Sequence, residues 1–253
     1  MEKKSKLKIV GIILAAGRGT RINSHEVNKV CLQFNGQSLI VYAAKLMQQV
    51  ADKTIVVVGA FSQSVKQSLL KYRVSYVNQD KQLGTANAVK VVIDSLEKIP
   101  DLVLVGYGDH MMFYTPQTVE QLVKLHLKTK AIMSLVSVTH VNPNELAWGR
   151  IIRDKNASVV DSREHKDASE QEKQITELNA GFYCFDCKFL QDNLNKVIPS
   201  PISKEYYINA LVKIAVDQNL IVSALKVPFS DVGIGINKQE ELKISEKLYK
   251  NNR

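Results

Sequence analysis

Small residues and arginines follow the first apolar segment of the chain. Residues 8–14 are almost continuously apolar, which is typical of a strand buried in a parallel sheet. Gly17 and Gly19 come after it, and because they lack a Cβ their backbone N–H groups can approach an anion closely. Arg18 and Arg21 add positive charge beside them. The chemistry is that of a phosphate-binding loop, although neither the Walker A spacing nor the dinucleotide fingerprint is present, and a glycine turn with solvated arginines is the alternative.

A carboxamide, a glycine and a threonine precede a helical pattern further along. Gln79 lies shortly before Gly84, where a flat ring could rest against bare backbone. Thr85 can cap the helix that follows, whose apolar face includes Val89 and Val92. The pattern is compatible with a ligand site, and equally with a glycine turn and a capping threonine.

A carboxylate follows the apolar strand predicted over residues 101–106. Ligands of open α/β sheets bind beyond the carboxyl ends of the strands, so we expect Asp109 to point into the crevice. Carboxylate oxygens beside phosphates suit Mg²⁺, which makes Asp109 a candidate metal ligand, with a turn or N-cap aspartate as the alternative. We interpret the adjacent His110 as a wall of the pocket and not as a catalytic base.

Apolar strands alternate with helical patterns through most of the chain, as in a parallel α/β sheet. The predicted strands are residues 8–14, 53–58, 74–77, 101–106, 131–138 and 220–227, and the predicted helices are residues 38–50, 62–72, 116–130, 204–217 and 237–253. Residues 140–185 contain two strands joined by a turn and are expected to form a β-rich subdomain over the crevice. We therefore predict one domain over residues 1–253 with a Rossmann-like, three-layer α/β fold. Its mixed, mainly parallel sheet carries helices on both faces and this small insertion.

The composition indicates one sizeable core and acidic partners. The chain has 253 residues, 45% of them apolar, and a formal net charge of +9. The lysines are spread along the chain without a basic stripe interleaved with aromatics, so we expect phosphorylated small molecules and no nucleic acid as partners. No apolar run reaches about 18 residues and the N-terminus does not resemble a signal peptide, so we expect a cytoplasmic protein without a membrane partner.

The motifs resemble those of a known enzyme family. Residues 14–21 (LAAGRGTR) and 28–30 (NKV) resemble the signature loop and lysine of the sugar-1-phosphate nucleotidyltransferases. Residues 79–86 (QDKQLGTA) are similar to the uracil-binding segment of bacterial N-acetylglucosamine-1-phosphate uridyltransferases. The segments WGRI (148–151), EHKDA (164–168) and LNAG (178–181) resemble the family's sugar-binding motifs in order and spacing, and KEYY (204–207) is also family-like. The resemblance, to the N-terminal uridyltransferase domain of these enzymes, covers about residues 8–245.

The resemblance implies roles for particular residues. It implies nucleotide binding by Leu14, Ala15, Ala16, Gly17, Gly19, Gln79, Gly84 and Thr85, and sugar binding by Tyr107, Gly149, Glu164 and Asn179. It implies charge stabilisation during catalysis by Arg21 and Lys29, and a Mg²⁺ site made of Asp109 and Asn237, a residue that by itself would be interpreted as a helix N-cap. Ala180 stands where the family has threonine, and HMM (110–112) replaces an apolar residue and proline, so the sugar is less well defined than the nucleotide.

The resulting hypothesis is a Mg²⁺-dependent uridyltransferase that makes a UDP-sugar. The expected substrates are UTP and N-acetylglucosamine 1-phosphate, with UDP-N-acetylglucosamine and pyrophosphate as products. Another sugar 1-phosphate, such as glucose 1-phosphate, is the alternative, and a non-catalytic nucleotide-sugar-binding protein is a further one. The hexapeptide repeats of the acetyltransferase domain in bifunctional relatives do not occur in this sequence, so we expect no acetyltransferase activity. The oligomeric state stays open.

Overall fold

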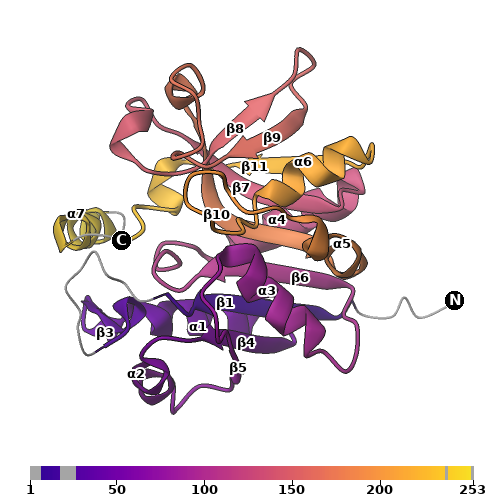
Figure 1. Cartoon of the computed structure of the whole chain (residues 1–253). Helices are drawn as coiled ribbons and strands as arrows, with labels where there is room; N and C mark the ends of the chain where they lie inside the picture. The colour runs from indigo at the N-terminus through magenta and orange to yellow at the C-terminus, as the bar shows by residue number, and fades with distance from the viewer. Residues whose placement is uncertain (1–6, 18–26, 237–238, 252–253) are drawn as a thin grey trace, which may run out of the picture.

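The strand β1 (Ile9–Ala15) is an interior strand of a mixed sheet in the computed structural model (Figure 1). The structure describes residues 7–17, 27–236 and 239–251. β1 pairs in parallel with β4 (Lys53–Val58) on one side and with β6 (Leu102–Tyr107) on the other. β4 pairs in parallel with β5 (Ser75–Asn78). Because all of these strands run in one direction, their carboxyl ends meet at one edge of the sheet.

The other half of the sheet contains an antiparallel strand. β10 (Glu177–Asp186) runs antiparallel between β6 and β7 (Met133–Thr139), and β11 (Val222–Lys226) pairs in parallel with β7. β8 (Arg150–Arg153) and β9 (Val159–Arg163) form an antiparallel hairpin that joins β10. The strand order is β11-β7-β10-β6-β1-β4-β5. This confirms the predicted mixed, mainly parallel sheet, and residues 140–185 supply both the hairpin and a strand of the main sheet.

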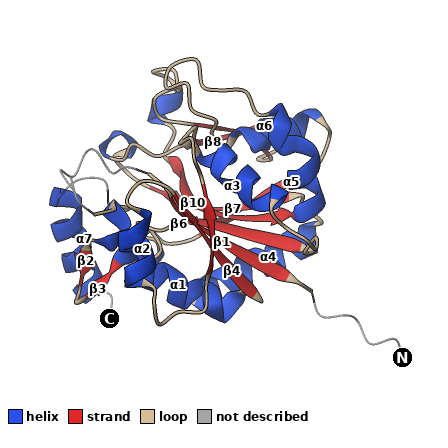
Figure 2. Cartoon of the chain, turned by 60° about the horizontal axis from the view of Figure 1, so that its bottom comes forward, coloured by secondary structure: helices blue, strands red, loops and turns tan. Residues whose placement is uncertain are grey.

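Helices cover both faces of the sheet, which completes the predicted three-layer fold (Figure 2). One face is covered by α3 (Thr85–Asp94), α5 (Cys187–Asn193) and α6 (Ala210–Asp217). The other is covered by α1 (Leu39–Val50), α2 (Ser62–Ser68) and α4 (Pro116–Thr129). Each helix buries one apolar stripe against the strands, which is where most helix stability in proteins originates. Within the described ranges, none of the helices has the length and apolar character needed to span a membrane.

The C-terminal helix α7 (Gln239–Asn251) is attached through aromatic rings. Its Tyr249 ring lies 5.2 Å from the Phe34 ring and 5.5 Å from the Phe113 ring, in edge-to-face arrangements. Phe34 belongs to a small hairpin formed by β2 (Gln33–Phe34) and β3 (Gln37–Ser38). The C-terminal helix is thereby joined to the segment that follows Lys29, far from it in sequence.

The predicted elements are present, and two helices show the largest differences in their limits. α2 ends at Ser68 instead of Tyr72, and α6 begins at Ala210 instead of Lys204. The late start of α6 has a physical reason: the Tyr206 N–H donates to the Leu83 carbonyl, and the Tyr206 carbonyl accepts from a distant N–H, so this backbone is not available for a helix.

A fully buried arginine holds the loop before β8. Arg150 is 0% exposed, and its guanidinium donates to the carbonyl oxygens of Pro143 (2.9 Å), Lys173 (3.3 Å) and Trp148, and to the Asn144 side chain (3.1 Å). A planar guanidinium supplies five N–H donors in a fixed fork, which an ammonium group cannot reproduce. The loop that carries Trp148 is therefore fixed by one side chain.

We expect Arg150→Lys to lower the free energy of unfolding by about 2 to 4 kcal/mol, because several buried carbonyl groups lose their donor while a charge stays buried. Urea unfolding measures the change. Arg163→Lys is the matched control: this arginine on β9 pairs with Asp161 and its side chain is 43% exposed, so the loss should stay below about 1 kcal/mol. Equal losses in the two variants would contradict the role given to Arg150.

Candidate functional site

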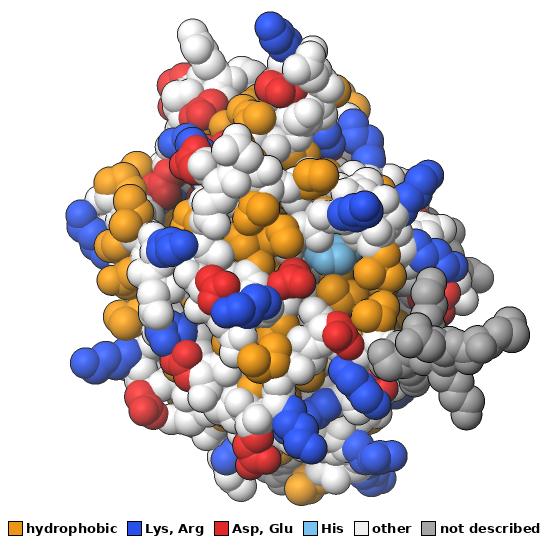
Figure 3. All heavy atoms as spheres, turned by 90° about the vertical axis from the view of Figure 1, so that its right-hand side faces the viewer, with side chains coloured by type: hydrophobic (Ala, Val, Ile, Leu, Met, Phe, Trp, Pro, Cys, Tyr) orange, Lys and Arg blue, Asp and Glu red, His pale blue; other side chains and the backbone are white. Residues whose placement is uncertain are grey.

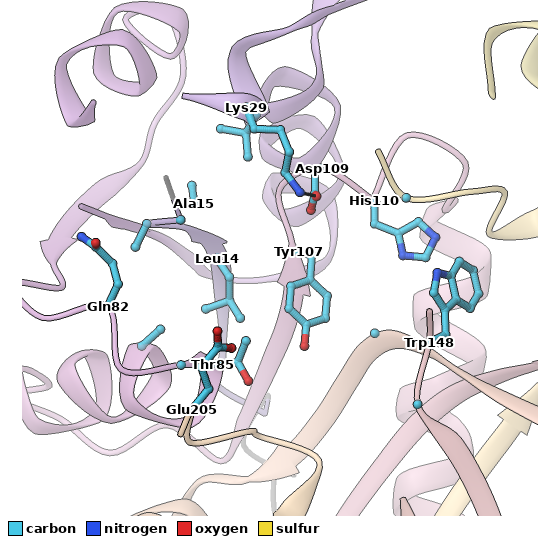
Figure 4. A pocket seen from close by; sticks show the side chains of 18 of the residues that line it. Leu14, Ala15, Lys29, Gln82, Thr85, Tyr107, Asp109, His110, Trp148 and Glu205 are labelled. Carbon is cyan, nitrogen blue, oxygen red and sulfur yellow. Dashed lines mark ion pairs between the residues drawn. The ribbon is translucent and has the colours of Figure 1, made fainter. Parts of the chain in front are cut away.

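A cavity of about 620 Å³ opens where the parallel strands end. Residues 14–17 at the end of β1 contribute to its walls, as do Tyr107, Asp109 and His110 at the end of β6 and Thr85 at the start of α3 (Figure 4). The predicted site residues that line the cavity are Leu14, Ala15, Ala16, Gly17, Lys29, Gln79, Gly84, Thr85, Tyr107, Asp109, Gly149, Glu164 and Asn179. Every predicted site residue that the structure describes is therefore at this cavity, whereas Gly19, Arg21 and Asn237 lie outside the described residues.

Lys29 and Asp109 form an ion pair at one wall of the cavity (Figure 4). Lys29 begins the 3-10 helix η2 (Lys29–Cys31), and Asp109 follows β6. The two side chains are 18% and 14% exposed, so the pair is largely shielded from water. The Asp109 carbonyl also accepts from the Ile236 N–H at 3.2 Å, which attaches the segment leading to residue 237 next to this carboxylate.

Gln79 has a fixed orientation beside the start of α3. Its Nε2 donates to the Gly84 carbonyl at 3.1 Å and to the Asn87 side-chain oxygen at 2.8 Å. A backbone carbonyl can act only as an acceptor, so the amide nitrogen must face it. Both N–H bonds of Gln79 are thus used within the protein, and its carbonyl oxygen is the atom left to accept a hydrogen bond from a ligand.

The prediction that Thr85 caps α3 is wrong. Gly84 occupies the N-cap position with φ +118°, and a Cβ there would lie 2.6 Å from the Tyr206 backbone, so only glycine fits without displacement. Thr85 is the first helical residue, and its Oγ1 accepts from the Ile208 N–H at 2.9 Å. The hydroxyl therefore connects α3 to the segment before α6.

The opposite wall is a hydrogen-bonded network around Asn179. Its Nδ2 donates to Ser162 Oγ at 3.1 Å and to the Tyr183 hydroxyl at 3.0 Å, and its Oδ1 accepts from the Gly181 N–H at 3.0 Å. Gly181 has φ +73°, and a Cβ there would lie 2.6 Å from the Tyr107 ring. Asn179 is thus held by three partners, so this wall is preorganised.

Other lining residues were not singled out from the sequence. They are Asn28, Gln82, Trp148, Tyr183 and Glu205, and Figure 4 shows Glu205 next to Thr85 and Trp148 next to His110. The rings of His110 and Trp148 are 4.7 Å apart, and burial lowers the pKa of His110. A neutral, packed ring agrees with its interpretation as a pocket wall. Of these residues, Asn28, Gln82, Trp148 and Glu205 had a sequence signal, because they lie in the NKV, QDKQLGTA, WGRI and KEYY segments, whereas Tyr183 lies in none of the quoted segments.

Comparisons with known proteins place the chain in a family. A family model described as nucleotidyl transferase matches residues 10–235. The chain belongs to the nucleotidyl transferase family. It is 36% identical over 243 residues to the "Bifunctional protein GlmU" of Geobacillus sp. (strain WCH70), covering 96% of this chain and 52% of that protein. It is also 36% identical over 241 residues to the Clostridium perfringens (strain ATCC 13124) protein of the same name, covering 95% and 52%.

The sequence match confirms the resemblance drawn from the motifs, and this nucleotidyltransferase spans about half the length of the curated relatives it matches. A solved structure of UDP-glucose pyrophosphorylase complexed with UDP-glucose shares the fold with a TM-score of 0.78. That likeness covers 98% of this chain and 100% of the other at 16% identity, so it supports the fold alone.

The described residues of this nucleotidyltransferase suit a metal shared with a ligand. Asp109 is a carboxylate at the cavity wall, and among the described residues no group of three or more His, Cys, Asp or Glu side chains could hold a metal by itself. Mg²⁺ commonly takes one or two protein oxygens and completes its shell with phosphates and water. The donor set therefore fits Mg²⁺ bound together with phosphate.

On the face shown in Figure 3, Lys and Arg are interspersed with Asp and Glu.

A carboxyl group with a raised pKa lies on the Asn179 side of the cavity. Burial is the main cause that raises the pKa of Glu164 to about 7, and the negative charges of Asp167 and Glu205 add to it. Arg150 and Lys166 act in the opposite direction. Near neutral pH, Glu164 is thus divided between a neutral form that can donate a hydrogen bond and an ionised form that accepts.

The raised pKa predicts how stability depends on pH. The folded state holds the Glu164 proton more tightly than the unfolded chain, so the stabilisation is complete below the unfolded pKa and is lost as pH rises through about 7. Compared with the wild type, Glu164→Gln should gain about 1 to 3 kcal/mol of relative stability between about pH 5 and pH 8. Urea unfolding across this range tests it. Glu120→Gln, at an exposed site on α4, should keep the wild-type slope, and a Glu164→Gln slope equal to wild type would refute the assignment.

Proposed function

We propose that this nucleotidyltransferase transfers a uridylyl group from UTP to N-acetylglucosamine 1-phosphate, with UDP-N-acetylglucosamine and pyrophosphate as products. The observation that supports it is the composition of one cavity. Gln79 and Gly84 line the part next to α3, Glu164 and Asn179 line the part next to β9 and β10, and Lys29 belongs to the wall at the ends of β1 and β6. A nucleotide and a sugar phosphate bound together need such an arrangement, with cationic charge near the phosphates.

The orientation of Gln79 supports uracil as the base. The N3 atom of uracil carries a hydrogen and donates, whereas the N3 atom of cytosine accepts. Since the two N–H bonds of Gln79 are used by Gly84 and Asn87, its carbonyl oxygen can accept from uracil N3–H and would face the lone pair of cytosine N3. A site built to hydrogen-bond one partner rejects an analogue that leaves its polar group unpaired.

The reaction needs charge neutralisation more than a general base. The second pKa of a phosphate monoester is about 6, so the sugar phosphate is largely ionised at neutral pH and can attack the α-phosphorus of UTP directly. A new O–P bond forms as the bond from the α-phosphorus to the pyrophosphate oxygen breaks. Lys29 is positioned at the cavity to stabilise negative charge on the triphosphate. Mg²⁺, held by Asp109 and Asn237, would neutralise phosphate charge when bound.

Sugar specificity is assigned to the β9 and β10 side of the cavity. The Asn179 network and Glu164 offer hydrogen-bonding groups of both kinds, which suit the hydroxyl and acetamido groups of a hexosamine. The presence of Lys29 and Asp109 at the same cavity favours a catalyst over a protein that merely binds nucleotide sugars.

The proposal predicts UTP-dependent pyrophosphate release with N-acetylglucosamine 1-phosphate, at a kcat/KM about 100-fold higher for UTP than for CTP. A panel of both nucleotides against N-acetylglucosamine 1-phosphate and glucose 1-phosphate measures it. Gln79→Leu should bring the UTP/CTP ratio toward one, whereas Gln49→Leu, which removes an exposed amide on α1, should leave it unchanged. Equal use of CTP by the wild type would exclude the base assignment, and a preference for glucose 1-phosphate would exclude the sugar.

For the metal, we expect Asp109→Asn to lower the rate about 10³-fold, with partial recovery at higher Mg²⁺, because the variant loses a charged metal ligand. A Mg²⁺ titration of activity measures both effects. Asp101→Asn is the control at the opposite end of β6, where the carboxylate accepts from the Lys8 N–H at 2.6 Å. If Asp109→Asn and Asp101→Asn share the wild-type rate and half-saturating Mg²⁺, the metal is bound elsewhere.

A further inference from the structure

The side chain of Asn28 gathers three backbone carbonyl oxygens in the interior of the site. The residue is 1% exposed, and its Nδ2 lies 3.0 Å from the Ala15 oxygen, 3.1 Å from the Gly17 oxygen and 2.9 Å from the Ala60 oxygen. An amide nitrogen has two N–H bonds, so at least one of them is shared between two acceptors. Ala15 is the last residue of β1 and Gly17 belongs to the segment that follows it; residues 15–17, where this segment is described, are called the glycine loop below, and Ala60 follows β4. The Asn28 carboxamide thus connects the segments that follow two neighbouring strands, β1 and β4.

The same residue also holds the turn that carries Lys29. Asn28 is the N-cap of η2, and its Oδ1 accepts from the Val30 N–H at 3.1 Å. Its own N–H donates to Ser64 Oγ on α2 at 3.1 Å. Every polar group of the Asn28 side chain is therefore engaged, on one side with the glycine loop and on the other with the lysine turn.

We propose that Asn28 is a positioning residue that fixes Lys29 relative to the glycine loop, an inference that rests on the function proposed above. In the structure the Lys29 ammonium is paired with Asp109. When a triphosphate draws the ammonium away from this carboxylate, the position that the long lysine side chain can reach depends on the backbone from which it starts. Asn28 fixes that backbone. A charge donor must be in place before the reaction to stabilise the transition state, and small displacements are costly.

The direction of the hydrogen bonds gives Asn28 a second effect on the loop. In a trans peptide the carbonyl and the following N–H point in opposite directions, and the described residues contain no cis peptide bond. Because the Ala15 oxygen points at Asn28, the Ala16 N–H points away from it. Asn28 thus keeps the carbonyl oxygens of Ala15 and Gly17, which would repel a phosphate, turned toward its own amide.

The test separates the amide donor from the helix cap. Asn28→Ser retains a side-chain oxygen at the N-cap position but lacks the amide that reaches the three carbonyl groups, and it adds no charge. Asn193→Ser is the matched control, because Asn193 is 3% exposed, donates to the Phe189 carbonyl at 2.9 Å, and lies at the end of α5 outside the described cavity wall. We expect Asn28→Ser to lower kcat about 10- to 100-fold at a temperature where thermal unfolding shows the protein to be folded, and Asn193→Ser to keep kcat within about twofold.

Hydrogen exchange provides a readout that does not depend on catalysis. In Asn28→Ser, amide exchange should accelerate together in peptides covering residues 14–17 and 29–31, and Asn193→Ser should leave both unchanged. If Asn28→Ser merely lowers the unfolding midpoint while kcat and exchange at residues 29–31 stay at wild-type values, the residue is structural and the inference is wrong. If the wild type releases no pyrophosphate from any substrate pair, the proposed function fails, and the exchange data still decide whether Asn28 couples the loop to the lysine turn.

Discussion

The parallel pairing of β1 with β4 and β6 is the constraint on which the site depends. The register places Leu14 opposite Val57 on β4 and opposite Tyr107 on β6, so the chain leaves all three strands at the same level. Residues that follow these strands are then neighbours whatever their separation in sequence. The glycine loop, Ala60 and Asp109 meet for this reason. Parallel strands need long connections, and here these connections are the helices that cover the sheet.

Hydrogen bonds between distant segments convert this edge into a cavity. The backbone of Tyr206 accepts from the Ala86 N–H and donates to the Leu83 carbonyl, both at 2.8 Å, and so fixes the segment before α6 across the start of α3. Asn209 performs the same task for the hairpin, since its Nδ2 donates to the Ser162 carbonyl at 3.0 Å. Buried backbone groups must find partners, and these partners determine where the cavity walls stand.

Charged side chains at the cavity are neutralised in two ways, by an ion pair and by a bound proton. Lys29 and Asp109 neutralise each other in an ion pair. On the other side of the cavity, burial raises the pKa of Glu164 to about 7, so a proton neutralises part of its charge near neutral pH. Isolated buried charges are expensive, which is the physical reason for the ion pair of Lys29 with Asp109 and for the raised pKa of Glu164.

Sequence determined much of the fold, because apolar periodicity and helix caps act over a few residues. It predicted the limits of β4 at Lys53 and Val58 and the start of α4 at Pro116. The site residues were predicted from the motif resemblance and from the rule that ligands bind beyond strand ends. Those that the structure describes all line one cavity.

Tertiary structure alone decided the partners across long separations. Thr85 bonds to residue 208 instead of capping its own helix, α6 starts late because Tyr206 pairs with residues 83 and 86, and Asn28 collects carbonyl groups from two other segments. A side-chain pattern does not encode such pairings, because each depends on which strands lie side by side and on which backbone groups their packing leaves without a partner.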